Sequence, residues 1–294
     1  MAIVIRLMGG LGNQMFQYAT AVALAHKHET VVIADLSLMN QDKLRDFELE
    51  KVFGITLSQD KGVIEKMVNR HSLIRKLLGN SIYNRIVPYY KRNIINEPHF
   101  SFDEKFSKYK DNVILVGYWQ SEKYFKTVED HIRKLFSFSR AKAKLDDINL
   151  AWLRSIRSTE LPVSIHIRRS DFLKSKVHLV LEESYYFRSM EWIMQNESAK
   201  PVYYIFTDDS EWASQHIKSQ NEVFFVKNNK NEDSYKDMLL MAECKINIIA
   251  NSSFSWWAAW LNSYKEKKCI APAHWFSDNA LDIKDLLPEK WIII

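Results

Sequence analysis

The second half of the chain alternates short apolar runs with longer stretches that have helical spacing. The apolar runs cover residues 163–167, 202–206, 223–226, 246–249 and 268–271. The intervening stretches at residues 183–195, 210–218, 232–244 and 252–261 have the length and spacing of helices. Strands that are separated by helices pair in parallel, and the helices cover both faces of the sheet. This half is therefore predicted to be an α/β domain built on a parallel sheet.

The beginning of the chain repeats this alternation around a glycine-rich loop. An apolar run at residues 3–7 precedes Gly9, Gly10 and Gly12, and a helical pattern at residues 13–29 follows, with Asn13 as its expected N-cap. Another apolar run at residues 31–34 completes a strand–helix–strand unit. The whole chain has only seven glycines in 294 residues. Three in one loop indicate a local need for a tight turn or for close approach of a ligand to the backbone.

Two domains are expected, with a boundary near residue 155. The N-terminal domain, residues 1–155, also contains a strand pattern at residues 112–119 and helical patterns at residues 122–136 and 141–160. Residues 60–110 are basic and show few strand signals. We interpret them as a solvated helical insertion, and an acceptor-side or membrane-facing surface is the alternative. The C-terminal domain spans residues 156–294.

Composition and charge exclude several classes of protein. The two cysteines, Cys244 and Cys269, are too few for a disulfide framework or a four-thiolate zinc site, so a reducing, cytoplasmic setting is expected. The first residues lack the features of a signal peptide. The longest apolar candidate, residues 246–261, is interrupted by Asn and Ser and falls short of a membrane span. A net charge of +5 is weak evidence for nucleic acid, which is not expected as a partner.

Ligands of open α/β sheets bind at the carboxyl ends of the strands, and polar motifs follow four of the expected strands. The first motif is the glycine loop. Gly10 and Gly12 match the start of the dinucleotide fingerprint, but Met15 occupies its third glycine position, and no Gly-Lys-Ser/Thr follows. From these rules alone, a simple strand-to-helix turn explains the loop equally well.

The second motif follows the strand at residues 163–167. His166 lies in the strand, and Arg168, Arg169 and Asp171 come at its carboxyl end. Two adjacent guanidinium groups can grip a diphosphate, and a carboxylate beside them can orient one of the two. A surface ion pair is the alternative, which is weakened because the run directly follows a buried strand.

The third and fourth motifs follow the strands at residues 202–206 and 246–249. Thr207 and Asp208 can cap the next helix, or Asp208 can accept hydrogen bonds from a guanine or a ribose. The run Asn251, Ser252, Ser253 and Phe254 opens a helix, where backbone N–H groups and hydroxyls can cradle an anion. The tryptophans behind it are expected to pack in the core.

A metal is not expected at these strand ends. The chain has no Asp-x-Asp sequence and no His/Cys cluster with ligand spacing. Arginines and helix N-termini are therefore expected to neutralise the charge of an anionic ligand.

Taken together, four motifs resemble those of the α-1,2-fucosyltransferases, and most closely those of the bacterial enzymes that build surface polysaccharides such as O-antigen. They are GGLGNQMFQYA at residues 9–19, HIRRSD at 166–171, FTDD at 206–209 and ANSSFSWWAAWL at 250–261. Two positions depart from the family pattern: Ser170 replaces a usual Gly, and Ile246 replaces a frequent His.

The resemblance implies a GT-B-like α/β fold, with two facing Rossmann-type domains that contain parallel sheets. It implies transfer of L-fucose from GDP-L-fucose, with inversion and without a metal or other cofactor. The implied acceptor is the 2-hydroxyl of a galactose in an oligosaccharide, which can be lipid-linked. This suggests a cytoplasmic enzyme with peripheral contact at the inner membrane surface.

The resemblance also assigns roles to residues. The catalytic candidates are Arg169, Asn13 and Asp171, where Asp171 is the nearest nominee for a base, with orientation of an arginine as its alternative role. The implied donor-binding residues are His166, Arg168, Arg169, Thr207, Asp208, Asn251, Ser252, Ser253 and Phe254. The implied interdomain loop contains Gly10, Gly12, Asn13 and Gln14. The alternatives are a GDP-fucose transferase that forms another linkage and a noncatalytic protein that binds a nucleotide or a polyanion.

Overall fold

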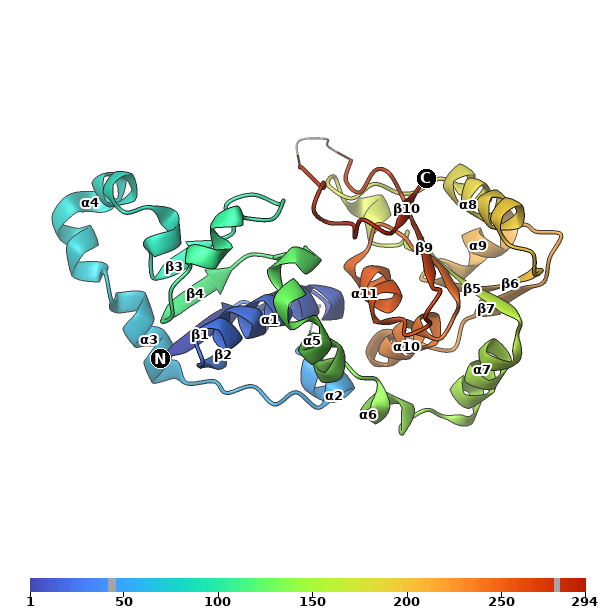
Figure 1. Ribbon diagram of the computed structural model, residues 1–294, viewed down its shortest axis with the longest axis horizontal. Helices are drawn as coiled ribbons and strands as arrows, with labels where there is room; N and C mark the ends of the chain where they lie inside the picture. The colour runs from blue at the N-terminus through green and yellow to red at the C-terminus, as the bar shows by residue number, and fades with distance from the viewer. Residues whose placement is uncertain (42–45, 278–280) are drawn as a thin grey trace. The chain divides into compact units, whose positions relative to one another are not determined.

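The computed structural model describes residues 1–41, 46–277 and 281–294 (Figure 1). The chain forms two compact units: Met1–Ser137 with Leu281–Leu286, and Phe138–Ala280 with Leu287–Ile294. The division falls between residues 137 and 138 rather than near 155, because helix α7 (Asp147–Ser158) packs against α10 of the second unit. The segment 281–286 belongs to the first unit, where Asp285 pairs with Lys123 at 2.6 Å.

The first unit contains a parallel sheet with the strand order β2-β1-β4-β3. Its strands are β1 (Ala2–Arg6), β2 (Val31–Asp35), β3 (Ile94–Asn96) and β4 (Val113–Val116). In register, Val4 of β1 lies beside Ile33 and Ile114. Strand β3 lies within the stretch that was interpreted as a helical insertion, so this part of the prediction was wrong. With only three residues, β3 is too short to give a strand pattern.

The helices of the first unit begin with α1, which is held against β1. They are α1 (Leu11–Lys27), α2 (Leu49–Phe53), α3 (Lys61–Asn69), α4 (Ser72–Ile86) and α5 (Glu129–Leu135). The 3-10 turns of the described residues are η1 (Met39–Gln41), η2 (Tyr89–Lys91), η3 (Glu104–Lys108), η4 (Glu122–Tyr124) and η5 (Lys126–Val128). The N-cap of α1 is Gly10, so the prediction of Asn13 as N-cap was wrong. Asn13 lies within the first turn of the helix.

The second unit contains a parallel sheet with the strand order β10-β9-β8-β5-β6-β7. Its strands are β5 (Leu161–Ile167), β6 (Pro201–Thr207), β7 (Val223–Val226), β8 (Ile246–Ile248), β9 (Lys268–Ala271) and β10 (Ile292–Ile293). The five expected strands of this half are confirmed, and the two-residue β10 adds an edge. Because β8, β5 and β6 are neighbours and parallel, the motifs that follow them meet at one edge of the sheet.

The helices of the second unit pack around a core of strand and helix side chains (Figure 1). They are α6 (Ser139–Lys142), α7, α8 (Glu183–Asn196), α9 (Ser210–His216), α10 (Tyr235–Ala242) and α11 (Ser253–Leu261), with 3-10 turns η6 (Phe172–Lys174) and η7 (Asn231–Asp233). Trp256, Trp257 and Trp260 of α11 are buried, as expected. Both cysteines are buried as well.

The turn between β1 and α1 depends on Gly9, whose φ of +76° is strained for any residue with a side chain. An added Cβ would also lie 2.6 Å from Nδ2 of Asn13. We therefore expect Gly9→Ala to lower the free energy of unfolding by about 1–2 kcal/mol, measured by urea denaturation. Gly10→Ala is the control, because φ −78° and ψ 178° at Gly10 suit any residue. Equal stability of the two variants would contradict this reading of the turn.

Candidate active site

The carboxyl end of β5 carries two arginines that carboxylates hold in place. Arg168 donates from Nη2 to Oδ2 of Asp171 at 2.7 Å, and its Nε lies 3.2 Å from Oδ2 of Asp208. Asp208 follows the neighbouring strand β6, so one side chain links two strand ends. The two acidic partners fix the direction of a guanidinium group whose side chain is 28 % exposed. The structure thus brings together Arg168 and Asp208, two of the expected donor-binding residues.

Arg169 is the better enclosed of the two arginines. Its backbone N–H donates to Oδ1 of Asp208 at 2.9 Å, and its Nε donates to Oδ2 of Asp209 at 3.4 Å. Its guanidinium carbon lies 3.9 Å from the centre of the Trp212 ring, a cation–π contact. The side chain is only 15 % exposed. The guanidinium is thus held by a carboxylate and an aromatic ring, which preorganises its charge for an anionic ligand.

The two aspartates after β6 have different roles, which the sequence did not separate. Asp209 is the N-cap of α9, because its Oδ1 accepts from the N–H of Trp212 at 3.1 Å. Thr207 supports this turn, since its Oγ1 accepts from the N–H of Asp209 at 2.9 Å. Asp208 instead holds the arginines of the neighbouring strand end. Its backbone oxygen also accepts from Ser170 Oγ at 3.0 Å, so the serine found at the usual glycine position adds a contact to this loop.

His166 is buried in β5, with its ring 5.7 Å from the ring of Phe254 on α11. Burial, assisted by the nearby charge of Arg168, lowers the pKa of His166 to about 3. The imidazole is therefore neutral at physiological pH, with one nitrogen able to donate and the other to accept. Its Nδ1 has no hydrogen-bond partner within the described ranges.

The loop between β8 and α11 combines a helix cap with a buried amide. Ser252 is the N-cap of α11, and its side chain accepts from the N–H of Phe254 at 3.3 Å. Asn251 donates from Nδ2 to the backbone oxygens of Leu179 and Trp275, at 2.8 and 2.7 Å. Asn251 thereby ties two distant loops to this edge of the sheet, while Ser253 and Phe254 remain partly exposed in the first turn of the helix.

Tyr186 of α8 is a site residue that the sequence reasoning missed. Its side chain is buried, and its hydroxyl has no partner among residues 1–41, 46–277 and 281–294. Burial raises the pKa of Tyr186, and the charges of Arg169 and Asp208 act on it in opposite directions. Tyr186 lies among the buried residues Tyr185, Met190 and Ile193 of α8, and the sequence gives no signal that separates this tyrosine from a core residue.

In the first unit, the glycine loop ends in a helix N-terminus that the protein itself occupies. Glu48 accepts the N–H of Leu11 at 3.0 Å, so a carboxylate already meets the first turn of α1. Gln14 is buried and bonds the backbone of Gly9 and Asp46, at 2.9 and 2.8 Å. Gln14, which the sequence assigned to the interdomain loop, therefore stabilises the fold of that loop. Gly10 and Gly12 shape the same turn.

Asn13 is partly exposed beside the carboxyl end of β4, the strand next to β1. Its Oδ1 accepts from Nε2 of Gln120 at 2.8 Å. The turn before Gln120 is held by Glu97, whose carboxylate accepts the N–H groups of Tyr118 and Trp119 at 2.7 and 2.9 Å. Burial raises the pKa of Glu97 to about 7, against the lowering effect of these two bonds. Glu97 and Gln120 are further residues that position Asn13, and no motif marked them.

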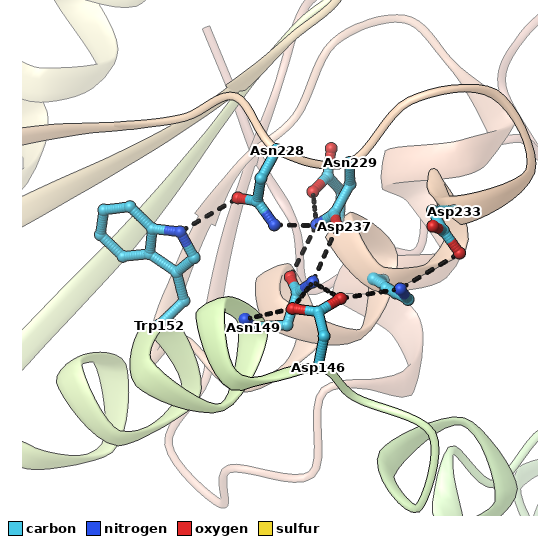
Figure 2. A network of polar contacts seen from close by, with 8 residues as sticks. Asp146, Asn149, Trp152, Asn228, Asn229, Asp233 and Asp237 are labelled. Atoms are coloured by element: carbon cyan, nitrogen blue, oxygen red, sulfur yellow. Dashed lines mark hydrogen bonds and ion pairs between the residues drawn. The ribbon is translucent and has the colours of Figure 1, made fainter.

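A second polar network ties the loop after β7 to helices α7 and α10 (Figure 2). Asn149 of α7 and Asn229 of the loop exchange amide hydrogen bonds at 2.9 and 2.8 Å. Asn229 also donates to Oδ1 of Asp237 at 2.6 Å, and Lys236 pairs with Asp146 at 2.9 Å. These contacts fix the first turns of two helices at the carboxyl edge of the sheet.

Asp237 in this network makes stability depend on pH. Burial raises the pKa of Asp237 to about 7, while an unfolded Asp titrates near pH ~3.9. Between these values the folded state keeps a proton that the unfolded state releases, so the free energy of unfolding falls as pH rises. We expect Asp237→Asn to flatten this fall in urea denaturation between pH 5 and 8. Asp233→Asn, an exposed carboxylate of the same network, is the control, and parallel profiles for wild type and Asp237→Asn would contradict the assignment.

The described residues contain neither a grouped set of metal-ligand side chains nor a helix that could cross a membrane. Outside residues 42–45 and 278–280, no group of three or more His, Cys, Asp or Glu side chains is placed to hold a metal ion. Across the same part of the chain, none of the helices has both the length and the apolar character to cross a membrane.

The sequence profile of glycosyl transferase family 11 matches residues 2–294, so the chain belongs to this family of glycosyltransferases. The O-antigen biosynthesis glycosyltransferase WbnK of Escherichia coli is 34 % identical over 97 % of this chain and 98 % of that protein. An alpha-1,2-colitosyltransferase of Escherichia coli is 34 % identical over 99 % of this chain and 98 % of its own length. Human galactoside alpha-(1,2)-fucosyltransferase 1 is 26 % identical over 86 % of this chain and 63 % of its length.

The fold resembles that of solved GT-B-type fucosyltransferases. The fucosyltransferase NodZ from Bradyrhizobium matches 87 % of this chain and 92 % of its own, with a TM-score of 0.50 and 16 % sequence identity. At this identity the likeness concerns the fold alone. The predicted α/β class with parallel sheets, of the GT-B type, is confirmed.

Proposed function

We propose that this glycosyltransferase transfers L-fucose from GDP-L-fucose to the 2-hydroxyl of a galactose, with inversion, during synthesis of a surface polysaccharide such as O-antigen. The observation that carries the proposal is the pair of arginines at the carboxyl end of β5, which Asp171, Asp208 and Asp209 hold in fixed directions. Such a pair suits the diphosphate of a nucleotide sugar. The names of the family-11 relatives support fucose-like donors and an α-1,2 linkage.

In the proposed reaction, the bond between the sugar and the β-phosphate breaks as the acceptor oxygen attacks from the opposite face. Negative charge develops on the departing GDP, and the sugar gains oxocarbenium character. Arg169 stabilises the departing phosphate, and the N-terminus of α11 around Ser252 and Ser253 adds its dipole. These groups are in place before the reaction, so they need little reorganisation.

Neutral His166 and Phe254 form the proposed surface for the nucleoside, with Thr207 and Asn251 at its margins. The buried Nδ1 of His166 and Oδ1 of Asn251 both lack partners within the described part of the chain, and a ligand's polar groups would satisfy them. Both carboxylate oxygens of Asp208 are engaged by the arginines. We therefore assign Asp208 the positioning of these arginines in addition to its expected place beside the guanosine.

The acceptor hydroxyl must lose a proton, and Asp171 is the candidate base from the sequence. In the structure, its Oδ2 accepts from Arg168 at 2.7 Å, so this oxygen is already engaged by a guanidinium group. We propose that Asp171 orients Arg168. Retained turnover in Asp171→Asn, with a raised KM for the donor, is the expected result. Loss of turnover at saturating donor would instead show that Asp171 acts as the base.

One relative favours a second donor. The alpha-1,2-colitosyltransferase of Escherichia coli matches this chain as closely as WbnK does. Colitose lacks the 3-hydroxyl of fucose, so the two GDP-sugars share every group that the arginines and His166 would contact. GDP-fucose and GDP-colitose must therefore be distinguished by experiment.

A donor panel tests the proposal. GDP-fucose, GDP-colitose, GDP-mannose and ADP-heptose are incubated with a β-galactoside in the presence of EDTA, and nucleotide release is followed. We expect acceptor-dependent release of GDP from GDP-fucose, unchanged by EDTA. A higher kcat/KM for GDP-colitose would change the proposed donor sugar but not the proposed site. Release only from ADP-heptose, or only with added metal, would overturn the proposal.

A further inference from the structure

Helix α4 exposes almost all of its surface. Of its 15 residues, only Tyr83 is buried. Its six large apolar side chains are between 38 % and 85 % exposed: Leu73, Ile74, Leu77, Leu78, Ile82 and Ile86. Contiguous apolar exposure of this kind marks a surface that meets something other than water.

The apolar side chains of α4 recur at intervals of four residues. Leu73 and Leu77, and likewise Ile74 and Leu78, lie one turn apart, as do Ile82 and Ile86. The helix is broken at Gly79, where φ is 74°. Each short segment on either side thus presents its own exposed apolar pair or pairs.

The same region carries the positive charge of the chain. From Lys66 to Asn96 there are seven Lys and Arg residues and neither Asp nor Glu. They are Lys66, Arg70, Arg75, Lys76, Arg85, Lys91 and Arg92. The net charge of the whole chain is +5, so the rest of the chain has a net charge of −2. A surface that is both apolar and strongly basic suits a partner that is both apolar and anionic.

The polar contacts of α4 gather around Tyr83 and reach the segment that follows the helix. The Tyr83 hydroxyl bonds Nδ1 of His71 at 2.6 Å, and the Arg75 guanidinium lies 4.9 Å from the Tyr83 ring. Arg75 and Arg92 tie the helix to the following segment, through Asn93 at 3.3 Å and the backbone oxygen of Asn84 at 2.8 Å. α3, in contrast, packs on the sheet through Met67. Helix α4 lies at the periphery of the first unit, beyond α3 (Figure 1).

We propose that α4 docks the protein on the surface of an anionic lipid bilayer, with its apolar side chains in the interface and its basic side chains at the head groups. A helix that combines apolar and basic side chains binds such a surface through both contributions. A second copy of this chain is the less suitable occupant, because two such surfaces would bring together seven positive charges from each copy.

Vesicle sedimentation with the full chain tests the proposal in 100 mM salt. The probes are phosphatidylcholine vesicles with and without 30 % phosphatidylglycerol. We expect at least tenfold stronger binding to the anionic vesicles, and a marked loss at 0.5 M salt. In the absence of donor and acceptor, this readout does not depend on the proposed transferase activity.

Matched variants locate the surface. Leu77→Ser with Ile82→Ser, and Lys76→Glu with Arg85→Glu, are each expected to weaken anionic binding at least tenfold. Ile148→Ser with Met194→Ser, and Lys144→Glu with Lys200→Glu, change exposed residues elsewhere and should remain within twofold of wild type. Circular dichroism checks that all four fold. Unchanged binding in both α4 variants, or an oligomer in ultracentrifugation that Leu77→Ser with Ile82→Ser dissociates, would overturn the proposal.

Discussion

Arg169→Ala is expected to reduce the turnover of donor by about 10²–10³-fold, the usual cost of removing one preorganised charge stabiliser from an active site. The guanidinium is only 15 % exposed and is held by Asp209 and Trp212, so no other side chain can readily take its place. Arg169→Lys should recover only part of the loss, because an ammonium group lacks the planar donor pair. Steady-state kinetics with a saturating acceptor give both values.

The matched control for Arg169→Ala is Arg154→Ala, on the exposed side of α7. It removes the same charge from the same unit and should leave kcat and KM unchanged. Near-wild-type turnover in a folded Arg169→Ala protein would contradict the leaving-group role. An equal loss in Arg154→Ala would show that net charge, rather than position, sets the rate.

Trp256→Ala is expected to lower the free energy of unfolding of the second unit by about 3–5 kcal/mol. Trp256 is fully buried and its ring lies 5.0 Å from Trp257, 6.2 Å from Trp260 and 5.4 Å from Trp291. Removing it leaves a large cavity behind the first turn of α11, so the Ser252 cap should also lose its fixed position. Urea denaturation measures the stability of the variant.

Trp256→Phe keeps an aromatic ring in this cluster and should lose less than half as much stability as Trp256→Ala. Donor affinity should follow the same order, since the cluster supports the helix that the proposal places at the phosphate. A small loss of stability in Trp256→Ala would show that the cluster repacks. If a destabilised Trp256→Ala protein kept wild-type donor affinity, the tryptophan cluster would not support the donor site.

The sheets could be predicted because their central strands are long enough to show a pattern. The bounds of β7 and β9 agree with the apolar runs residue for residue. The edges could not be predicted, because the three residues of β3 and the two of β10 are too few for any periodicity. The division between the units was set too late, since the contacts that assign α7 to the second unit are made with α10, far along the chain.

The candidate site could be predicted where its residues follow a strand directly. Parallel strands bring Arg168, Arg169 and Asp208 to one edge, and the structure shows the contacts between them. Tyr186 could not be predicted, because it lies within a helix whose neighbouring residues have core character. Glu97 was equally hidden, since its role depends on a turn that begins about twenty residues later.

The exposed face of α4 was only half visible in the sequence. The basic residues were evident, but a run of Leu and Ile in a helix is normally buried, and only the structure shows these side chains exposed. The interpretation as a solvated helical stretch therefore agrees with the exposure of α4, but it did not predict that so many of the exposed side chains would be apolar.

The central claim, transfer of fucose to O2 of galactose with inversion, is tested most directly by the structure of the product. The full chain is incubated with GDP-L-fucose and a β-galactoside, and the purified product is examined by NMR. We expect an α-fucosyl residue whose anomeric proton is coupled through the linkage to C2 of galactose. A fucosyl residue on any other carbon, a β anomer, or an acceptor returned unchanged would contradict this claim.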